Sequence, residues 1–132
     1  MADREIEHRP DRIAQIHISV TDLDASVAFY RDVLGLTHLF TVPGQPMAFF
    51  DAGGVRLYLG VPEDETYRSR PVIYYNVADL DATYDAVVER GAKTLSAPQL
   101  VHTDGSNELW MAFVSDPDGN PVGMSSERAV TA

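Results

Sequence analysis

The sequence predicts an α+β protein made of two βαβββ modules, and two observations support this prediction. The hexapeptide Val20–Ala25 (VTDLDA) returns later in the chain as Val77–Ala82 (VADLDA), with a single difference. Each copy lies between a segment with the alternation of a strand and a segment with the apolar spacing of an amphipathic helix. Two copies of such a unit indicate a duplicated module and not a solenoid, which needs about three or more repeats.

The first half of the chain predicts a strand, a helix and then three strands. Residues 13–20 alternate between apolar and polar side chains, as expected for a strand with one buried face. Asp22 or Thr21 is expected to cap a helix that runs to about Leu34 and ends at Gly35. Turn residues then separate three further strands, which are expected around Leu39 and over residues 47–51 and 55–61.

The second half repeats that order. A strand over residues 72–77 precedes a helix that Asp79 caps, and this helix is expected to run to about Arg90 before Gly91. A short strand is then expected over residues 93–95 and a loop over residues 97–107. A strand over residues 108–115, a hairpin turn at residues 116–120 and a final strand over residues 122–126 complete the module.

The length and composition limit the possible functions. At 132 residues the chain has room for one domain with a hydrophobic core. A net charge of -10 argues against nucleic acid as a partner, and no apolar run approaches the roughly 20 residues of a membrane span. Because the chain has no cysteine, it has no disulfide, no thiol nucleophile and no cysteine-bound metal, and a cytoplasmic location is expected.

The expected domain covers residues 13–126. Its two modules are expected over residues 13–61 and 72–126, and the charged segment 62–71, which starts and ends with proline, is the expected linker. The segments outside the domain are expected to be a flexible lead-in and a tail, at residues 1–12 and 127–132.

The order of these elements and three local patterns resemble the vicinal oxygen chelate superfamily. The patterns are the repeated Val-x-Asp-Leu-Asp, the helix end Phe29–Leu36 (FYRDVLGL) and the turn Asp116–Asn120 (DPDGN). This superfamily includes glyoxalase I, bleomycin-resistance proteins, fosfomycin-resistance enzymes, extradiol dioxygenases and methylmalonyl-CoA epimerase. The resemblance covers about residues 13–126. It implies two modules whose eight strands form an open, cup-like mixed sheet, with the helices outside and a ligand inside.

The resemblance also implies where a divalent metal binds in catalytic members, which use it to stabilise an enolate or oxyanion. One ligand is expected on the first and last strands of each module, and the corresponding positions here are Gln15, Tyr58, Val72 and Gly123. Gln15 can coordinate a metal. Val72 and Gly123 have no side-chain donor, and Tyr58 can coordinate only as a phenolate, so the usual set of four ligands is incomplete.

A non-standard metal site is a second hypothesis. His17 lies two residues after Gln15 and is therefore expected on the same face of the strand. His102 or Glu108 could approach this pair from the second module. Such nitrogen and oxygen donors suit zinc, nickel, manganese or iron. The alternative is that no metal is bound and that His17 lines the cup as a hydrogen-bonding residue.

Strand alternation predicts which side chains line the cup, if the more apolar face of each strand packs under the helices. The predicted lining is aromatic, with one cation and several hydrogen-bonding groups. It consists of Gln15, His17, Arg56, Tyr58, Tyr74, Asn76, Glu108 and Trp110. The alternative is that the aromatic side chains simply fill the core.

These features leave three functions open. The first is a metal-free binding protein that, like the bleomycin-resistance members, holds a small aromatic or oxygen-rich molecule in an aromatic cup. The second is a lyase, isomerase or dioxygenase that uses one divalent metal at the non-standard site. The third is a regulatory domain that has lost the pocket. The resemblance also implies a homodimer, in which segment 62–71 would allow two chains to exchange modules.

Overall fold

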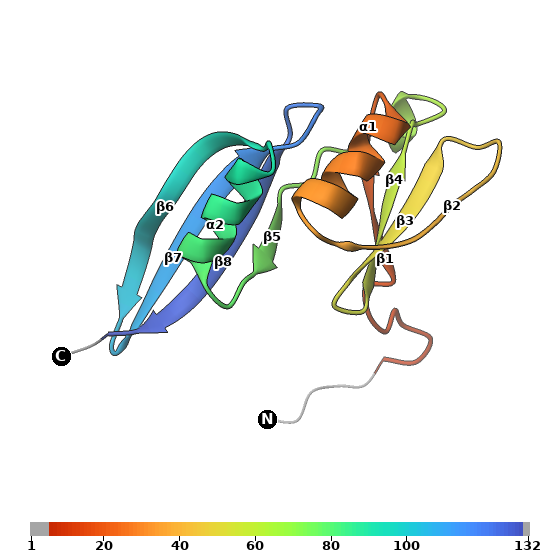
Figure 1. The fold of residues 1–132 in the computed structure, drawn as a ribbon. Coiled ribbons are helices and arrows are strands. Elements are labelled where there is room, and N and C mark those ends of the chain that lie inside the picture. The colour runs from red at the N-terminus through yellow and green to blue at the C-terminus, as the bar shows by residue number, and fades with distance from the viewer. Residues whose placement is uncertain (1–5, 131–132) are drawn as a thin grey trace.

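The computed structural model describes residues 6–130, and its helices and strands follow the order of two βαβββ modules (Figure 1). The first module consists of β1 (Gln15–Ser19), α1 (Leu23–Ala28), the π-helix η1 (Phe29–Val33), β2 (Thr37–Thr41), β3 (Met47–Ala52) and β4 (Val55–Gly60). The second consists of β5 (Ile73–Asn76), α2 (Leu80–Glu89), β6 (Lys93–Asp104), β7 (Asn107–Ser115) and β8 (Pro121–Ala129). A short 3₁₀-helix, η2 (Glu65–Tyr67), lies in the linker between them. No helix within residues 6–130 is long and apolar enough to cross a membrane.

Each module forms one four-stranded mixed sheet. The strand order is β1-β4-β3-β2 in the first sheet and β5-β8-β7-β6 in the second sheet. In both sheets the first and last strands of the module pair in parallel, and all other neighbours pair antiparallel. This arrangement confirms the predicted α+β class, with eight strands in two open sheets.

The repeated hexapeptide starts the helix of each module. The Asp22 carboxylate accepts a hydrogen bond from the Ala25 N–H at 3.1 Å, and Asp79 accepts one from the Ala82 N–H at 3.1 Å. Both aspartates have an extended backbone and satisfy an N–H group that the start of a helix leaves free. Of the two caps considered for the first helix, the structure uses Asp22.

The first helix differs from the expectation because it widens after α1. Residues Phe29–Val33 form a π-helix, and the N–H of Leu34 bonds to the carbonyl of Phe29, five residues earlier, at 2.9 Å. Phe29 and Tyr30, adjacent in the sequence, are both buried in this wider turn. Gly35, with a φ of 89°, then ends the element as predicted.

The segment 97–104, expected as a loop, is the second half of the long strand β6. β6 pairs with β7 along its length, but the register shifts at several places between Thr94 and His102. Such bulges insert unpaired residues and interrupt the alternation by which a strand is recognised in a sequence. β8 also continues past residue 126, to Ala129, because Ala129 pairs with Asn107 on β7.

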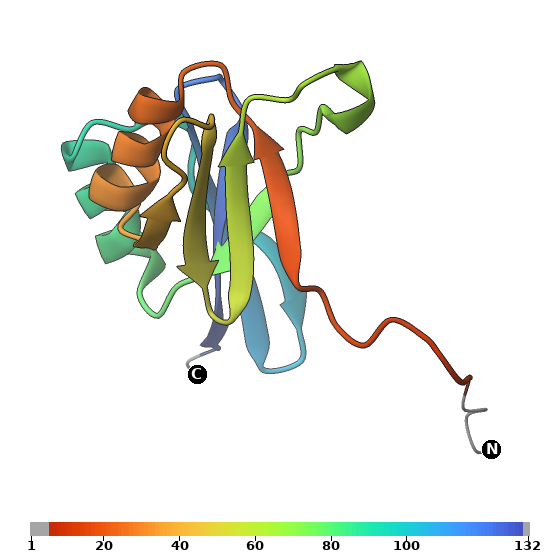
Figure 2. The same ribbon diagram turned by 90° about the vertical axis from the view of Figure 1, so that its right-hand side faces the viewer.

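α1 and α2 each cover one face of their own sheet, and neither lies on the other face (Figures 1 and 2). The covered faces carry large buried side chains, which form one hydrophobic cluster that draws on both modules. They include Phe50, Leu57 and Leu59 in the first sheet and Val114 and Met124 in the second sheet. We call the uncovered faces the open faces of the first and second sheets.

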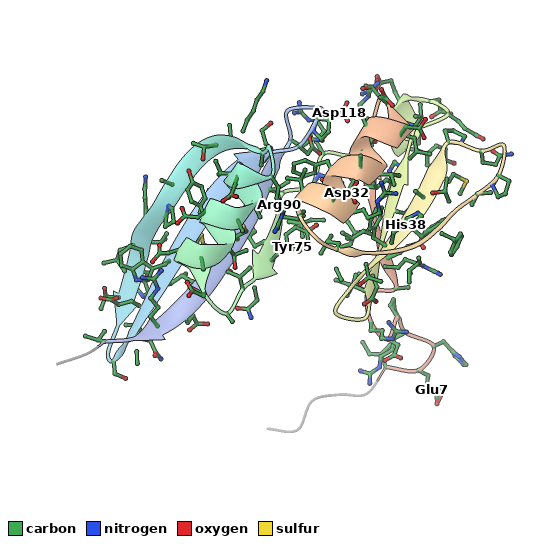
Figure 3. All side chains as sticks on the ribbon, in the orientation of Figure 1. Glu7, Asp32, His38, Tyr75, Arg90 and Asp118 are labelled. Carbon is green, nitrogen blue, oxygen red and sulfur yellow. The ribbon has the colours of Figure 1, made fainter. Side chains whose placement is uncertain are left out.

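The helices lie between the two modules, so the open faces point away from each other. Arg90, directly after α2, donates a hydrogen bond from Nε to the carbonyl of Val33 in η1 at 2.9 Å. Figure 3 shows Arg90 and Tyr75 in the space between the modules, and Figure 2 shows the first sheet from the side that no helix covers. A single chain therefore presents two separate half-cups on its outer sides. Between its modules lies a further cavity of about 480 Å³, which Ile16 and Leu57 line from the first module and Met124 from the second.

A buried carboxylate connects the modules. Asp116, in the turn between β7 and β8, accepts a hydrogen bond from the Tyr30 hydroxyl at 3.0 Å. The same carboxylate accepts the side-chain N–H of Asn120 at 3.1 Å and the backbone N–H groups of Asp118 and Asn120 at 2.9 and 2.8 Å. Burial and the nearby Asp116 charge raise the pKa of Tyr30 far above its ordinary value, so its phenol remains a donor. We call these four residues the Asp116 cluster.

Two further contacts join the modules beside this cluster. Thr21, just before α1, donates from Oγ1 to Oδ1 of Asp118 at 2.7 Å, and Figure 3 shows Asp118 close to the start of that helix. Arg70, at the end of the linker, donates from Nε to Oδ1 of Asn120 at 2.8 Å. The helix-end pattern and the DPDGN turn, which the sequence offers as separate patterns, are therefore partners in one contact.

We expect Tyr30→Phe to lower the free energy of unfolding by about 1.5–3 kcal/mol, because it removes a hydrogen bond to a buried charged group. Urea unfolding followed by circular dichroism measures this change. Tyr67→Phe is the matched control, since it removes a hydroxyl from a side chain that is 64% exposed, and it should shift stability by less than about 0.5 kcal/mol. Equal stability of both variants and the parent protein would show that the Asp116 cluster does not stabilise the fold.

Candidate functional site

Four ring side chains cross the open face of the first sheet, one from each strand. Phe40, Phe49, Tyr58 and His17 follow one another with ring centroids 4.8, 5.0 and 4.6 Å apart. The register produces this alignment, because Phe40 pairs with Phe49, Phe49 with Tyr58, and Tyr58 with His17. Phe49 and Tyr58 are stacked, with an interplanar angle of 24°. We call these four side chains the aromatic row.

A cavity of about 620 Å³ lies over the end of the aromatic row that carries His17 and Tyr58. The sheet contributes Gln15, His17, Met47 and Tyr58 to its wall. The opposite wall is the linker, which contributes residues 61–63 and 66–69. This volume is in the range of sites that hold small organic molecules. Of the predicted lining residues, Gln15, His17 and Tyr58 are therefore brought together in one cavity.

Ser69 holds the end of the linker against β1. Its N–H donates to the Ser19 hydroxyl at 2.8 Å, and its carbonyl accepts the Ser19 N–H at 3.3 Å. Its hydroxyl donates to the His17 carbonyl at 2.5 Å and lies 3.0 Å from Nδ1 of the same residue. β1 is an edge strand, so the linker satisfies backbone groups that the sheet leaves unpaired.

Gly60 provides the space into which the two rings fold. A Cβ atom at this position would lie 2.6 Å from Cε1 of Tyr58 and 3.2 Å from Nε2 of His17. Both rings therefore lie over the Gly60 backbone, and any larger residue would displace the Tyr58 ring. The positions of His17 and Tyr58 in the cavity thus depend on a glycine at the end of β4.

Arg56 lies beside the aromatic row on the same open face. Its guanidinium carbon is 5.4 Å from the centroid of the Phe49 ring, within the range of a cation–π contact. The residue is exposed and pairs across the sheet with Gln15. Arg56 therefore places a positive charge at the edge of the row and not within the cavity.

Tyr74 and Asn76 lie on β5, away from this cavity, and contribute instead to the cavity of about 480 Å³ between the modules. The Tyr74 ring covers Gly123, where a Cβ atom would lie 2.8 Å from its Cδ2 atom. It also contacts Phe113 edge to face, with ring centroids 5.5 Å apart. Tyr74 is nevertheless 51% exposed. The second half-cup is thus an apolar surface with an exposed tyrosine on it.

Glu108 and Trp110 do not line either half-cup, so this part of the predicted lining is wrong. Trp110 donates from Nε1 to Glu108 at 3.0 Å, and the guanidinium of Arg128 lies over its ring at 4.4 Å. Arg128 in turn pairs with Asp81 of α2 at 3.3 Å, which places the group on the helix-covered face. The open face of β7 instead carries the larger apolar residues, with Phe113 among them.

The four predicted metal ligands do not lie together in this chain. Gln15 and His17 lie side by side in the first sheet, but Glu108 is on the covered face of the second sheet and His102 is on β6, opposite Leu109. Among residues 6–130, no group of three His, Asp or Glu side chains is arranged to hold a metal ion. Of the four positions implied by the resemblance, Val72 and Gly123 also lack a donor.

Phe40, Phe49 and all of the linker side chains of the site escaped the sequence analysis. Phe40 and Phe49 extend the row, and Ser69 holds the linker against His17. A signal for Phe49 was present, because the turn Gly53–Gly54 fixes the register of β3 against β4 and places Phe49 opposite Tyr58. No local signal identifies Ser69, whose position depends on how a charged linker folds back over the sheet.

Comparisons with known proteins identify the family of this chain. A family model described as the glyoxalase/bleomycin resistance protein/dioxygenase superfamily matches residues 12–124. A metallothiol transferase FosB of Lysinibacillus sphaericus is 31% identical over 114 residues, which cover 82% of this chain and 77% of that protein. The virulence protein STM3117 of Salmonella typhimurium is 23% identical over 121 residues, which cover 87% of this chain and 83% of that protein.

A solved structure has the same fold. The lactoylglutathione lyase of Agrobacterium tumefaciens superposes with a TM-score of 0.70 at 23% identity, over 89% of this chain and 95% of that chain. This likeness supports the two-module architecture and its strand order. Because the family model covers nearly all of residues 13–126, this chain belongs to the glyoxalase/bleomycin resistance protein/dioxygenase superfamily.

Proposed function

We propose that this protein binds a small planar aromatic molecule in the cavity over the first sheet, without using a metal. The aromatic row is the observation that carries the proposal. Its rings are spaced 4.6 to 5.0 Å apart and end at the cavity with Tyr58 and His17. A planar ligand that lies on this end gains stacking contacts and removes apolar ring surface from water.

The polar groups around the cavity limit the ligand to a small, partly polar molecule. Gln15 and His17 offer hydrogen bonds from the sheet, and Glu63 faces them from the linker. Arg56 supplies one positive charge at the rim. A few polar groups in a mostly apolar wall are typical of sites that fix the orientation of an organic ligand.

The alternative is a metal-dependent lyase, isomerase or dioxygenase, and one observation favours it. A relative at 31% identity is named a metallothiol transferase, so a metal-dependent protein is among the proteins similar to this chain. Against it, the positions at which the resemblance implies metal ligands include Val72 and Gly123. We therefore place the binding function first.

The half-cup of the first sheet is open on its outer side, and we propose that a second copy of the chain closes it. The open face of the second sheet carries exposed apolar side chains, among them Tyr74 at 51% and Val72 at 45% exposure. Since the half-cups of one chain point apart, a two-fold dimer could bring the second half-cup of one copy over the first half-cup of the other. Such a dimer would bury these apolar groups and complete the cup.

We expect Tyr58→Leu to weaken the binding of planar aromatic compounds by about three- to tenfold, because it removes a stacking surface worth about 0.5–1.5 kcal/mol. Isothermal titration calorimetry with 2-naphthol and indole measures this. Trp110→Phe is the matched control, since Trp110 lies on the covered face of the second sheet. A loss of affinity in the control as large as in Tyr58→Leu would contradict the location of the site.

We expect the protein purified without added metal to contain no stoichiometric zinc, nickel, manganese or iron, because the donor set is incomplete. Inductively coupled plasma mass spectrometry measures the content, and calorimetry before and after treatment with EDTA should give the same ligand affinity. Stoichiometric metal that disappears in His17→Ala would favour the metal-dependent enzyme instead.

A mixing experiment tests whether the cup is shared between two copies. We expect Tyr58→Leu and Tyr74→Ala each to weaken ligand binding. When the two variants are refolded together, about half of the dimers contain one copy of each, and one of the two sites in such a dimer has both walls intact. Tight binding should therefore return at about a quarter of all sites. Calorimetric stoichiometry measures the recovery, with each variant refolded alone as the control. No recovery, together with a monomer in sedimentation equilibrium, would show that each chain forms its site alone.

A further inference from the structure

The hydroxyl of Ser69 has one hydrogen and two neighbouring groups on His17. It lies 2.5 Å from the His17 carbonyl, to which it donates, and 3.0 Å from Nδ1 of the same residue. The backbone of Ser69 is held independently by two hydrogen bonds to Ser19, so the hydroxyl cannot easily turn away. The carbonyl is the closer and stronger acceptor, and it lies on an edge strand where the sheet supplies no partner.

This geometry assigns the neutral tautomer of His17. Because the only Ser69 hydroxyl hydrogen goes to the carbonyl, its oxygen can interact with Nδ1 only as an acceptor. Nδ1 must then carry the proton, and Nε2 of the neutral ring carries the lone pair. Ser69 therefore acts as a positioning residue that fixes both the orientation of the imidazole ring and the nitrogen that remains an acceptor.

The other ring nitrogen, Nε2, lies beside Gly60 and the Tyr58 ring. Nε2 is 3.2 Å from the position that a Cβ atom of Gly60 would occupy, on the same side as the Tyr58 ring. His17 and Tyr58 both line the cavity, with ring centroids 4.6 Å apart. Within residues 6–130, the hydrogen bond of the His17 ring is the one at Nδ1, to Ser69. Nε2 of His17 is thus a hydrogen-bond acceptor beside the Tyr58 ring, and no donor within residues 6–130 bonds to it.

We infer that His17 selects ligands that carry a hydrogen-bond donor at the edge of an aromatic ring, such as a phenol or a ring N–H. This inference rests on the proposed function, because it assumes that the ring of the ligand stacks on the Tyr58 end of the aromatic row. The hydrogen-bond donor at the edge of the ligand ring then bonds to Nε2 of His17. An ether or N-methyl analogue of the same shape cannot make this hydrogen bond to Nε2, which is unfavourable.

The experiment compares ligands that differ only in the donor. Calorimetry at pH 8 measures 2-naphthol against 2-methoxynaphthalene and indole against 1-methylindole. For the parent protein we expect the donor-bearing member of each pair to bind about five- to tenfold more tightly, as one neutral hydrogen bond provides. In His17→Phe, which keeps a ring and loses the acceptor, this preference should disappear.

Ser69→Ala and nitrogen NMR test the tautomer itself. In the parent protein labelled with ¹⁵N-histidine, the two-bond correlations of His17 should show a protonated Nδ1 and an unprotonated Nε2. Ser69→Ala should shift His17 towards the other tautomer and reduce the ligand preference without removing it. Ser96→Ala is the matched control, because the Ser96 hydroxyl donates to the carbonyl of the next residue, Ala97, and not to a histidine.

The outcomes separate this inference from the proposed function. If both members of each pair bind the parent protein equally, or if NMR shows the Nε2–H tautomer, the inference is overturned and the aromatic binding function stands. If none of the four compounds binds, the proposed function fails and the inference fails with it. A preference that survives in His17→Phe assigns the selection to another residue and also overturns the inference.

Discussion

The hydrogen bond between Tyr30 and Asp116 is the contact on which the arrangement of the whole chain depends. It joins the helical side of the first module to the β7–β8 turn of the second. The Asp116 residue is only 4% exposed, and its carboxylate also accepts hydrogen bonds from Asp118 and Asn120. A buried carboxylate with several donors is stable only when all of them are in place. The cluster therefore fixes how the modules sit together.

The functional surface follows from that placement. Because the modules pack with α1 and α2 between them, the helices occupy the faces that meet, and the sheets turn their other faces outward. The linker leaves the first module at the end of β4, crosses the open face and returns to the second module through Arg70. One wall of the cavity is thus a consequence of chain connectivity, since the linker must pass β1 to reach β5. Ser69, one residue before Arg70, lies where the linker touches both the site and the contact between the modules.

The features that could be predicted from the sequence are those with local causes. The two modules, the helix caps and the order of strands follow from alternation, capping chemistry and turn residues, and all of them are present. The position of His17 on the same open face as Gln15 follows from the two-residue period of a strand. The π-helix and the bulges of β6 do not have such a pattern, because both depend on packing against distant residues. The position of Ser69 likewise depends on the path of the linker and not on its neighbours in the sequence.

The one error of face, at Glu108 and Trp110, is informative about the second half-cup. The rule that the more apolar face of a strand packs under the helix assigns Leu109, Met111 and Phe113 to the core, but α2 packs on the smaller side chains of Ala112 and Val114. A helix can approach a sheet closely only where the side chains beneath it are small. The larger apolar side chains are left on the open face, where they are only partly buried. The second sheet therefore has apolar side chains on both faces, whereas a sheet with one solvated face carries polar side chains there. In this chain α2 covers one of the two faces, and the apolar side chains of the other face stay partly exposed.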